Sequence, residues 1–127
     1  MSCIHRFIAV DGNFRWESIS VQGYESSEMQ GTTVRWLVGP EEGAPSFAVR
    51  YFEVEPGGFT SLDVHEHDHG VVVLRGRGRV QLGDDTVDVS FGDVVYVSPC
   101  DQHQFRCVGQ EPFGFLCVIP AERSRHE

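Results

Sequence analysis

The chain has 127 residues, of which 40% are hydrophobic and 23% charged, and its formal net charge is −9. These values fit one compact domain, and no apolar stretch approaches the roughly 18 residues that are needed to cross a membrane. The basic residues are all arginines. The absence of lysine excludes Schiff-base chemistry, and the acidic balance argues against a nucleic-acid partner.

The N-terminal segment MSCIHRFIAV lacks the basic head and the long apolar run of a signal peptide, which predicts a cytoplasmic location. The four cysteines, Cys3, Cys100, Cys107 and Cys117, show no CxxC spacing. In a chain without an export signal we expect reduced thiols. A cross-strand pair between Cys107 and Cys117 is the alternative.

Residues 11–31 are polar and show neither a strand-like alternation nor a sustained 3.6-residue apolar period. We expect residues 1–31 to form an N-terminal extension that packs on the domain or on a partner chain. At the other end, residues 121–127 read as a polar tail. His5 and His126 belong to these ends, and we expect surface or structural roles for both.

Residues 32–120 consist of short β-branched and aromatic runs that are broken by glycine, proline and acidic turn residues. The predicted strands are VRWLV (34–38), FAVRYFEVE (47–55), GVVVLRG (70–76), RVQLG (79–83), TVDVSFG (86–92), DVVYVS (93–98), HQFRCV (103–108) and FGFLCVIP (113–120). Many short strands with regular turns predict an all-β sandwich or barrel.

Histidines cluster in the segment His65-Glu66-His67-Asp68-His69, and a further histidine, His103, begins a later strand. Asp63 and His65 share a face because side chains alternate along a strand, and a bend can return His69 toward them. A divalent metal would neutralise and order such a group inside a barrel. The alternative is a solvated histidine-rich loop.

The stretch from Gly57 to Cys107 resembles the paired motifs of the cupin superfamily. The first motif, G(X)5HXH(X)3–4E(X)6G, matches in every interval, with Asp63 in place of the first histidine and His69 in place of the glutamate. The second motif, G(X)5PXG(X)2H(X)3N, keeps Gly92 and His103 but has Ser98, Cys100 and Cys107 at its proline, glycine and asparagine. The resemblance implies a double-stranded β-helix, or jelly-roll barrel, over residues 32–120.

The resemblance also implies one divalent transition metal ion per chain, held by Asp63, His65, His69 and His103. His67 is the alternative to Asp63, since His65 and His67 form a literal HxH. Counting from His67 would place Val71 or Val72 at the glutamate position, and neither can bind a metal. Mixed imidazole and carboxylate ligands suit Mn, Fe, Co, Ni, Cu or Zn, and the sequence does not choose among them.

Cupins include dioxygenases, isomerases, lyases and simple ligand binders, so the fold alone does not define the reaction. We expect a metal-dependent enzyme of the dioxygenase or isomerase/lyase type that acts on a small organic substrate. A non-catalytic small-ligand-binding or sensing module is the alternative, and a metal that only stabilises the barrel is a third reading. No catalytic base stands out, although Glu66 and Asp68 are the nearest carboxylates, and Cys107 is either a pocket thiol or a small core residue. A homodimer through residues 1–35 and edge strands is expected.

Overall fold

The computed structural model describes residues 2–26 and 28–121. The described residues form eleven strands and one short 3-10 turn, Pro40–Glu42. The strands are β1 (Phe7–Val10), β2 (Asn13–Trp16), β3 (Gln22–Ser26), β4 (Met29–Val38), β5 (Phe47–Phe59), β6 (His69–Arg75), β7 (Arg77–Leu82), β8 (Asp85–Ser90), β9 (Val94–Val97), β10 (His103–Cys107) and β11 (Phe113–Pro120). All eight predicted strands are confirmed, and the fold is all-β. Apart from Ala121, the predicted tail and His126 lie outside the described residues.

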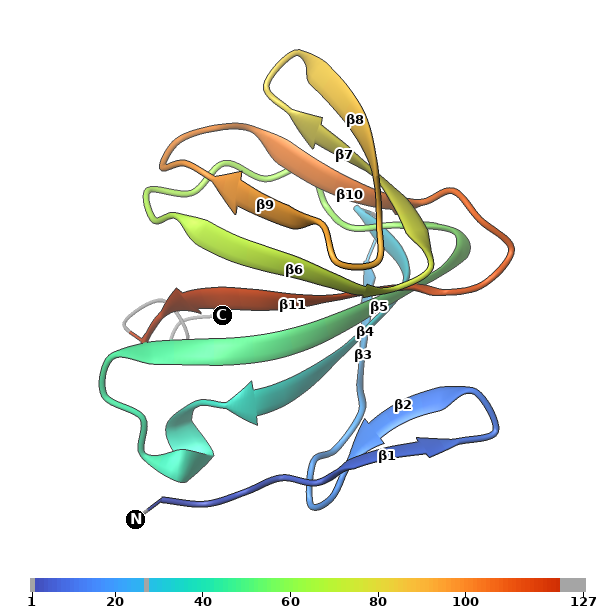
Figure 1. Cartoon of the computed structure of the whole chain (residues 1–127). Coiled ribbons are helices and arrows are strands. Elements are labelled where there is room, and N and C mark those ends of the chain that lie inside the picture. Colours follow the sequence, from blue (N-terminus) through green and yellow to red (C-terminus); the bar gives the residue numbers. More distant parts are fainter. Residues whose placement is uncertain (1, 27, 122–127) are drawn as a thin grey trace.

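The strands form one curled antiparallel sheet with a small hairpin against it (Figure 1). β5 lies between β4 and β11, and the sheet continues from β11 through β6 to β9. At the C-terminal end of β5, Phe59 lies opposite Arg106 of β10. β10 in turn pairs with β7, and β7 pairs with β8. The sheet therefore folds over on itself as a jelly-roll barrel, as predicted.

The core fills the space inside this curl, because alternate residues of each strand face it. On β5 the inward series includes Ala48, Phe52 and Val54, and on β11 it includes Phe113 and Phe115. Phe105 of β10 stacks on Phe115 with ring centroids 4.6 Å apart. The core is thus aromatic near β10 and valine-rich toward β6, where Val71 and Val73 are fully buried.

The prediction that residues 11–31 lack strands is wrong. This segment contains β2, β3 and the first residues of β4. β1 and β2 form a hairpin that packs its aromatic rings on the outer face of β5, where Trp16 lies 5.1 Å from Tyr51 between ring centroids. These strands are therefore stabilised by tertiary contacts, and the local sequence pattern does not predict them.

The cysteines are free thiols, as expected. Cys107 and Cys117, the alternative pair, are buried and are not bonded to each other. In the part of the chain that the structure describes, no helix is long and apolar enough to span a membrane.

Candidate metal centre

The predicted site residues lie together at one end of the barrel, at the first residues of two strands and in one connection. His69 begins β6 and His103 begins β10, while Asp63 and His65 lie in the connection from β5 to β6. Asp63 and His103 form a β-bridge in which each backbone N–H donates to the other's carbonyl, at 3.0 and 2.9 Å. This bridge fixes the connection against β10.

The second cupin-like motif keeps its turn despite the loss of its glycine. Cys100, at the glycine position, has a φ of 68°, in the left-handed region that glycine adopts most readily. Its backbone N–H donates to the carbonyl of His65 at 2.6 Å, and the Ser98 hydroxyl donates to Asp101 at 2.6 Å. Local hydrogen bonds thus compensate for the missing glycine and tie the turn to the histidine segment.

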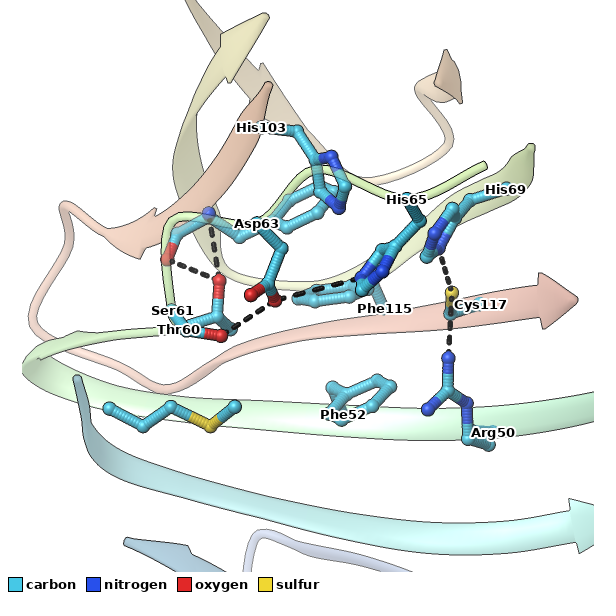
Figure 2. Close-up of a pocket in the computed structure, with 12 residues that line it drawn as sticks. Arg50, Phe52, Thr60, Ser61, Asp63, His65, His69, His103, Phe115 and Cys117 are labelled. Carbon is cyan, nitrogen blue, oxygen red and sulfur yellow. Dashed lines mark hydrogen bonds and ion pairs between the residues drawn. The ribbon is translucent and has the colours of Figure 1, made fainter. Parts of the chain in front are cut away.

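His65, His69 and His103 form a compact group whose potential ligand atoms all lie within 4.8 Å of one another. The rings of His65 and His103 are 5.3 Å apart between centroids, and those of His69 and His103 are 5.0 Å apart (Figure 2). His69 and His103 are buried, whereas His65 is partly exposed. Three imidazoles at this spacing can share one ion.

The outer ring nitrogens of two histidines have partners that aim the other nitrogens inward. His103 Nδ1 donates to the Asp101 carbonyl at 2.9 Å, and His69 Nδ1 lies 3.3 Å from the Cys117 sulfur. Histidines that bind metals are oriented in this way by hydrogen bonds at the opposite nitrogen. His69 Nε2 is buried and has no hydrogen-bond partner among the described residues. A divalent transition metal fits this donor set.

Burial sets the charge state of the group. Desolvation, followed by the charges of His103, His67, His65 and Arg50, lowers the pKa of His69 to about 3. His69 is therefore neutral near pH 7, the state in which imidazole binds a metal.

Asp63 and His67, the two candidates for a fourth ligand, lie differently. Asp63 lines the cavity, accepts a hydrogen bond from the Ser61 hydroxyl at 2.6 Å, and has Oδ2 3.8 Å from His65 Nε2. His67 is buried behind the group, with its ring 4.7 Å from that of His69, and does not line the cavity. The position of Asp63 favours it, but the choice of fourth ligand stays a prediction.

His65, His69 and His103 line a cavity of about 250 Å³ with mostly apolar walls. Phe52, Phe105, Phe115 and Met29 supply much of the wall. Two lining residues, Arg50 and Cys117, were not identified from the sequence. A signal was present for both, since each occupies an inward position of a strand whose other core-facing residues are apolar.

The remaining sequence candidates lie elsewhere. Cys107 is buried but does not line the cavity, and its thiol donates to the Glu111 carbonyl at 3.2 Å, which agrees with a small core residue. Asp68 accepts a hydrogen bond from the Tyr96 hydroxyl at 2.9 Å. Neither Asp68 nor Glu66 lines the cavity, so the structure offers no support for either as a catalytic base.

The protein is thus a small jelly-roll barrel with a group of three histidines, which could hold a metal ion, at one end. Comparison with known families agrees, because residues 50–119 match the Cupin domain family. The chain belongs to the cupin family.

Relatives of known sequence and structure cover nearly the whole chain. The 1-methylthio-D-xylulose 5-phosphate methylsulfurylase of Rhodospirillum rubrum is 35% identical over 121 residues, which span 94% of this chain and 77% of that protein. A conserved-barrel cupin from Rhodopseudomonas palustris matches with a TM-score of 0.83 at 32% identity, over 94% of this chain and 81% of its own. The polyketide cyclase RemF from Streptomyces resistomycificus matches with a TM-score of 0.79 at 27% identity, over 95% and 80%. Two of these relatives are named as enzymes.

Proposed function

We propose that this cupin is a metal-dependent enzyme that converts a small organic substrate in the cavity of about 250 Å³. The observation that carries the proposal is the group of three imidazoles, His65, His69 and His103, at the cavity wall. A purely structural site would have no need of an adjoining cavity. Asp63 completes the proposed ligand set.

The reaction class that we propose is isomerisation or lyase-type bond cleavage. A divalent ion in this site would supply Lewis-acid chemistry at a carbonyl or hydroxyl oxygen of the substrate. The aromatic walls would exclude water from the reacting group, which strengthens electrostatic interactions there. The methylsulfurylase and cyclase names of two relatives favour this class over a dioxygenase.

Cys117 is proposed as a positioning residue. Its sulfur lies 3.3 Å from His69 Nδ1 and receives an Arg50 N–H at 3.7 Å. A sulfur that accepts the Nδ1 proton keeps Nε2 of His69 directed at the metal position. Replacing such a partner typically costs about 10 to 100-fold in metal affinity.

The first experiment is elemental analysis of tag-free protein, for wild type beside His65→Ala and His103→Ala. About one equivalent of a transition metal in wild type, lost in both variants, supports the site and directs assays to phosphorylated and thioether-bearing keto compounds. Absence of metal even after reconstitution would contradict the proposal. Stabilisation by such compounds without turnover would instead favour the sensing alternative.

We also propose that the chain forms a homodimer. β9 ends the sheet and carries the exposed side chains of Val94 and Tyr96, and Phe91 just before it is 74% exposed. Apolar side chains on an edge strand favour association. Light scattering should give twice the chain mass for wild type and a shift to monomer for Tyr96→Glu, whereas a monomeric wild type at micromolar concentration would refute the dimer.

A further inference from the structure

The cavity beside the histidine group has a polar side and an apolar side. Figure 2 shows the rings of His65, His69 and His103 on one side of the pocket and Phe52 across from them. Met29, the first residue of β4, also lines the pocket. A molecule in the cavity therefore contacts the imidazoles, or a metal that they hold, at one end and apolar side chains at the other.

Three phenylalanine rings give the apolar side a preformed surface. The ring of Phe115 is stacked with those of Phe52 and Phe105, at centroid distances of 5.6 and 4.6 Å and interplanar angles of 23° and 26°. All three side chains are buried. Close packing holds them in place, so a ligand that contacts them does not have to order them first.

The hydroxyl groups of the wall already have hydrogen-bond partners within the protein. The Ser61 hydroxyl donates to Asp63 Oδ2 at 2.6 Å. Thr60 Oγ1 accepts the Phe105 N–H at 3.0 Å and donates to the Phe105 carbonyl at 3.5 Å. A ligand hydroxyl placed against the phenylalanine rings would lose its hydrogen bonds with water and gain none there, which is costly. The apolar side is therefore unsuited to a polyhydroxylated compound.

The volume of the cavity, about 250 Å³, limits the size of the apolar group. An apolar cavity of about 150 Å³ is sufficient for benzene. The space beside the histidines therefore accommodates one ring-sized apolar group and a short oxygen-bearing group.

We propose that the cavity selects a small carbonyl or hydroxyl compound that carries a ring-sized apolar group, in preference to a polyhydroxylated compound such as a sugar, and that Met29 contributes to this selection. The oxygen of such a compound faces the histidines, and its apolar group contacts Met29, Phe52 and Phe115. This inference rests on the proposed function and adds the substrate class to it.

Ligand-observed NMR titration of tag-free protein tests the selection with three neutral ketones: acetophenone, cyclohexyl methyl ketone and erythrulose. The carbonyl group is common to all three, so a difference in affinity comes from the rest of the molecule. Each buried CH₂ group strengthens binding about fourfold, and we expect at least one apolar ketone to bind about tenfold or more tightly than erythrulose. Erythrulose that binds as tightly as both apolar ketones, or apolar ketones without measurable binding, would overturn the proposal.

The matched variants are Met29→Gln and, as a control, Phe7→Gln. Glutamine keeps the length of the methionine side chain and makes its end polar. Phe7 is 50% exposed and lines a second cavity, of about 640 Å³, between the β1–β2 hairpin and strands β4, β5 and β11. Met29→Gln should weaken the binding of apolar ketones about three- to tenfold and leave erythrulose within about twofold, whereas Phe7→Gln should leave all three within about twofold.

The reverse pattern, with a loss in Phe7→Gln alone, would place the ketones in the second cavity and overturn the proposal. Unchanged ketone affinity in a folded Met29→Gln variant would remove the role of Met29. Met29→Ala gives the same test if the glutamine variant does not fold, because it also removes the apolar end of the side chain from the wall.

The same titrations on chelator-treated protein separate this inference from the proposed function. If wild type takes up no metal, the proposed enzyme fails, yet a preference for apolar ketones that weakens in Met29→Gln still supports the selection by the cavity. If wild type holds a metal and binds erythrulose as tightly as the apolar ketones, the metal site stands and this inference is wrong.

Discussion

The two faces of β5 carry buried arginine clusters with opposite designs. On the outer face, Glu53 accepts hydrogen bonds from the Tyr51 hydroxyl and from Arg75, both at 3.0 Å, and lies 3.9 Å from Arg35. On the inner face, one residue earlier than Tyr51, Arg50 points into a cavity beside Cys117 and the histidines. One strand thus separates a network that is built around Glu53 from a group of residues that lines a cavity.

The contrast separates stability from function. The outer network is covered by the β1–β2 hairpin, whose Phe14 ring lies 5.9 Å from that of Tyr51 and beneath the Arg75 guanidinium at 4.8 Å. Burial, and then the neighbouring Glu53 carboxylate, raises the pKa of Tyr51. Gly114 lies directly against the Tyr51 hydroxyl, and a side chain there would clash with it. The residues of this network do not line the cavity of about 250 Å³, whereas Arg50 and Cys117 on the inner face do.

The largest effect on stability should come from Glu53→Ala in the outer network. It leaves the buried Arg35, the partly buried Arg75 and the Tyr51 hydroxyl without their common acceptor, and breaking a buried ion pair in this way costs about 3 to 5 kcal/mol. Urea unfolding monitors the loss. The control is Asp88→Asn, which breaks an exposed pair with Arg79 and should change little. Equal unfolding midpoints for Glu53→Ala and wild type would remove the contrast between the two faces.

In the inner cluster, a substitution should affect metal binding more than the stability of the fold. His103→Ala removes an imidazole from the ligand group and is expected to weaken metal binding by about a hundredfold or more, roughly 2.7 kcal/mol. With chelator present, the variant should lose a smaller part of its stability, which comes from the hydrogen bond of His103 Nδ1 to the Asp101 carbonyl and from the ring contact with Phe105. Metal titration and thermal unfolding, with and without chelator, measure both parts. A variant that retains full metal affinity would argue against the histidine group as the site.

A finer comparison within the inner cluster concerns the fourth ligand. Asp63→Asn should lower metal affinity by about 10 to 100-fold, because the carboxylate at the cavity wall is lost. His67→Gln should lower it less, since this ring is stacked behind His69 and does not line the cavity. Isothermal titration with Mn²⁺ or Zn²⁺ ranks the two. The opposite ranking would assign the fourth position to His67.

The most gradual effect should be a pH dependence of the metal-free protein. The pKa of His69 is lowered to about 3, from 6.5 in an unfolded chain, so the unfolded state takes up a proton that the folded state does not. Stability should therefore fall as the pH drops from about 6.5 toward 3. His69→Gln should flatten this part of the profile of unfolding midpoint against pH, while His5→Gln, at a half-buried pair with Glu42, serves as the control. An unchanged slope in His69→Gln would place the dependence on other groups.

Sequence patterns predicted the barrel well because its strands carry their own signal. The runs at 47–55 and 113–120 alternate or concentrate β-branched and aromatic residues between turn residues, and each became a central strand. The segment at 11–31 failed this test because β2 and β3 gain their stability from a neighbouring surface rather than from local pattern. Spacing to known cupin motifs singled out His65, His69 and His103, which the fold brings within 4.8 Å.

The sequence by itself determined the all-β class and indicated the group of histidines and the free thiols, because periodicity, residue type and motif spacing are local properties. Only the tertiary structure decided that Cys117 contacts both His69 and Arg50, since Cys117 lies 48 positions from His69 and 67 positions from Arg50 in the sequence. It also decided that the Tyr51–Glu53 network is closed on the other face of the same strand. Strand order determines which distant inward positions meet, and the sequence of a single strand does not contain that order.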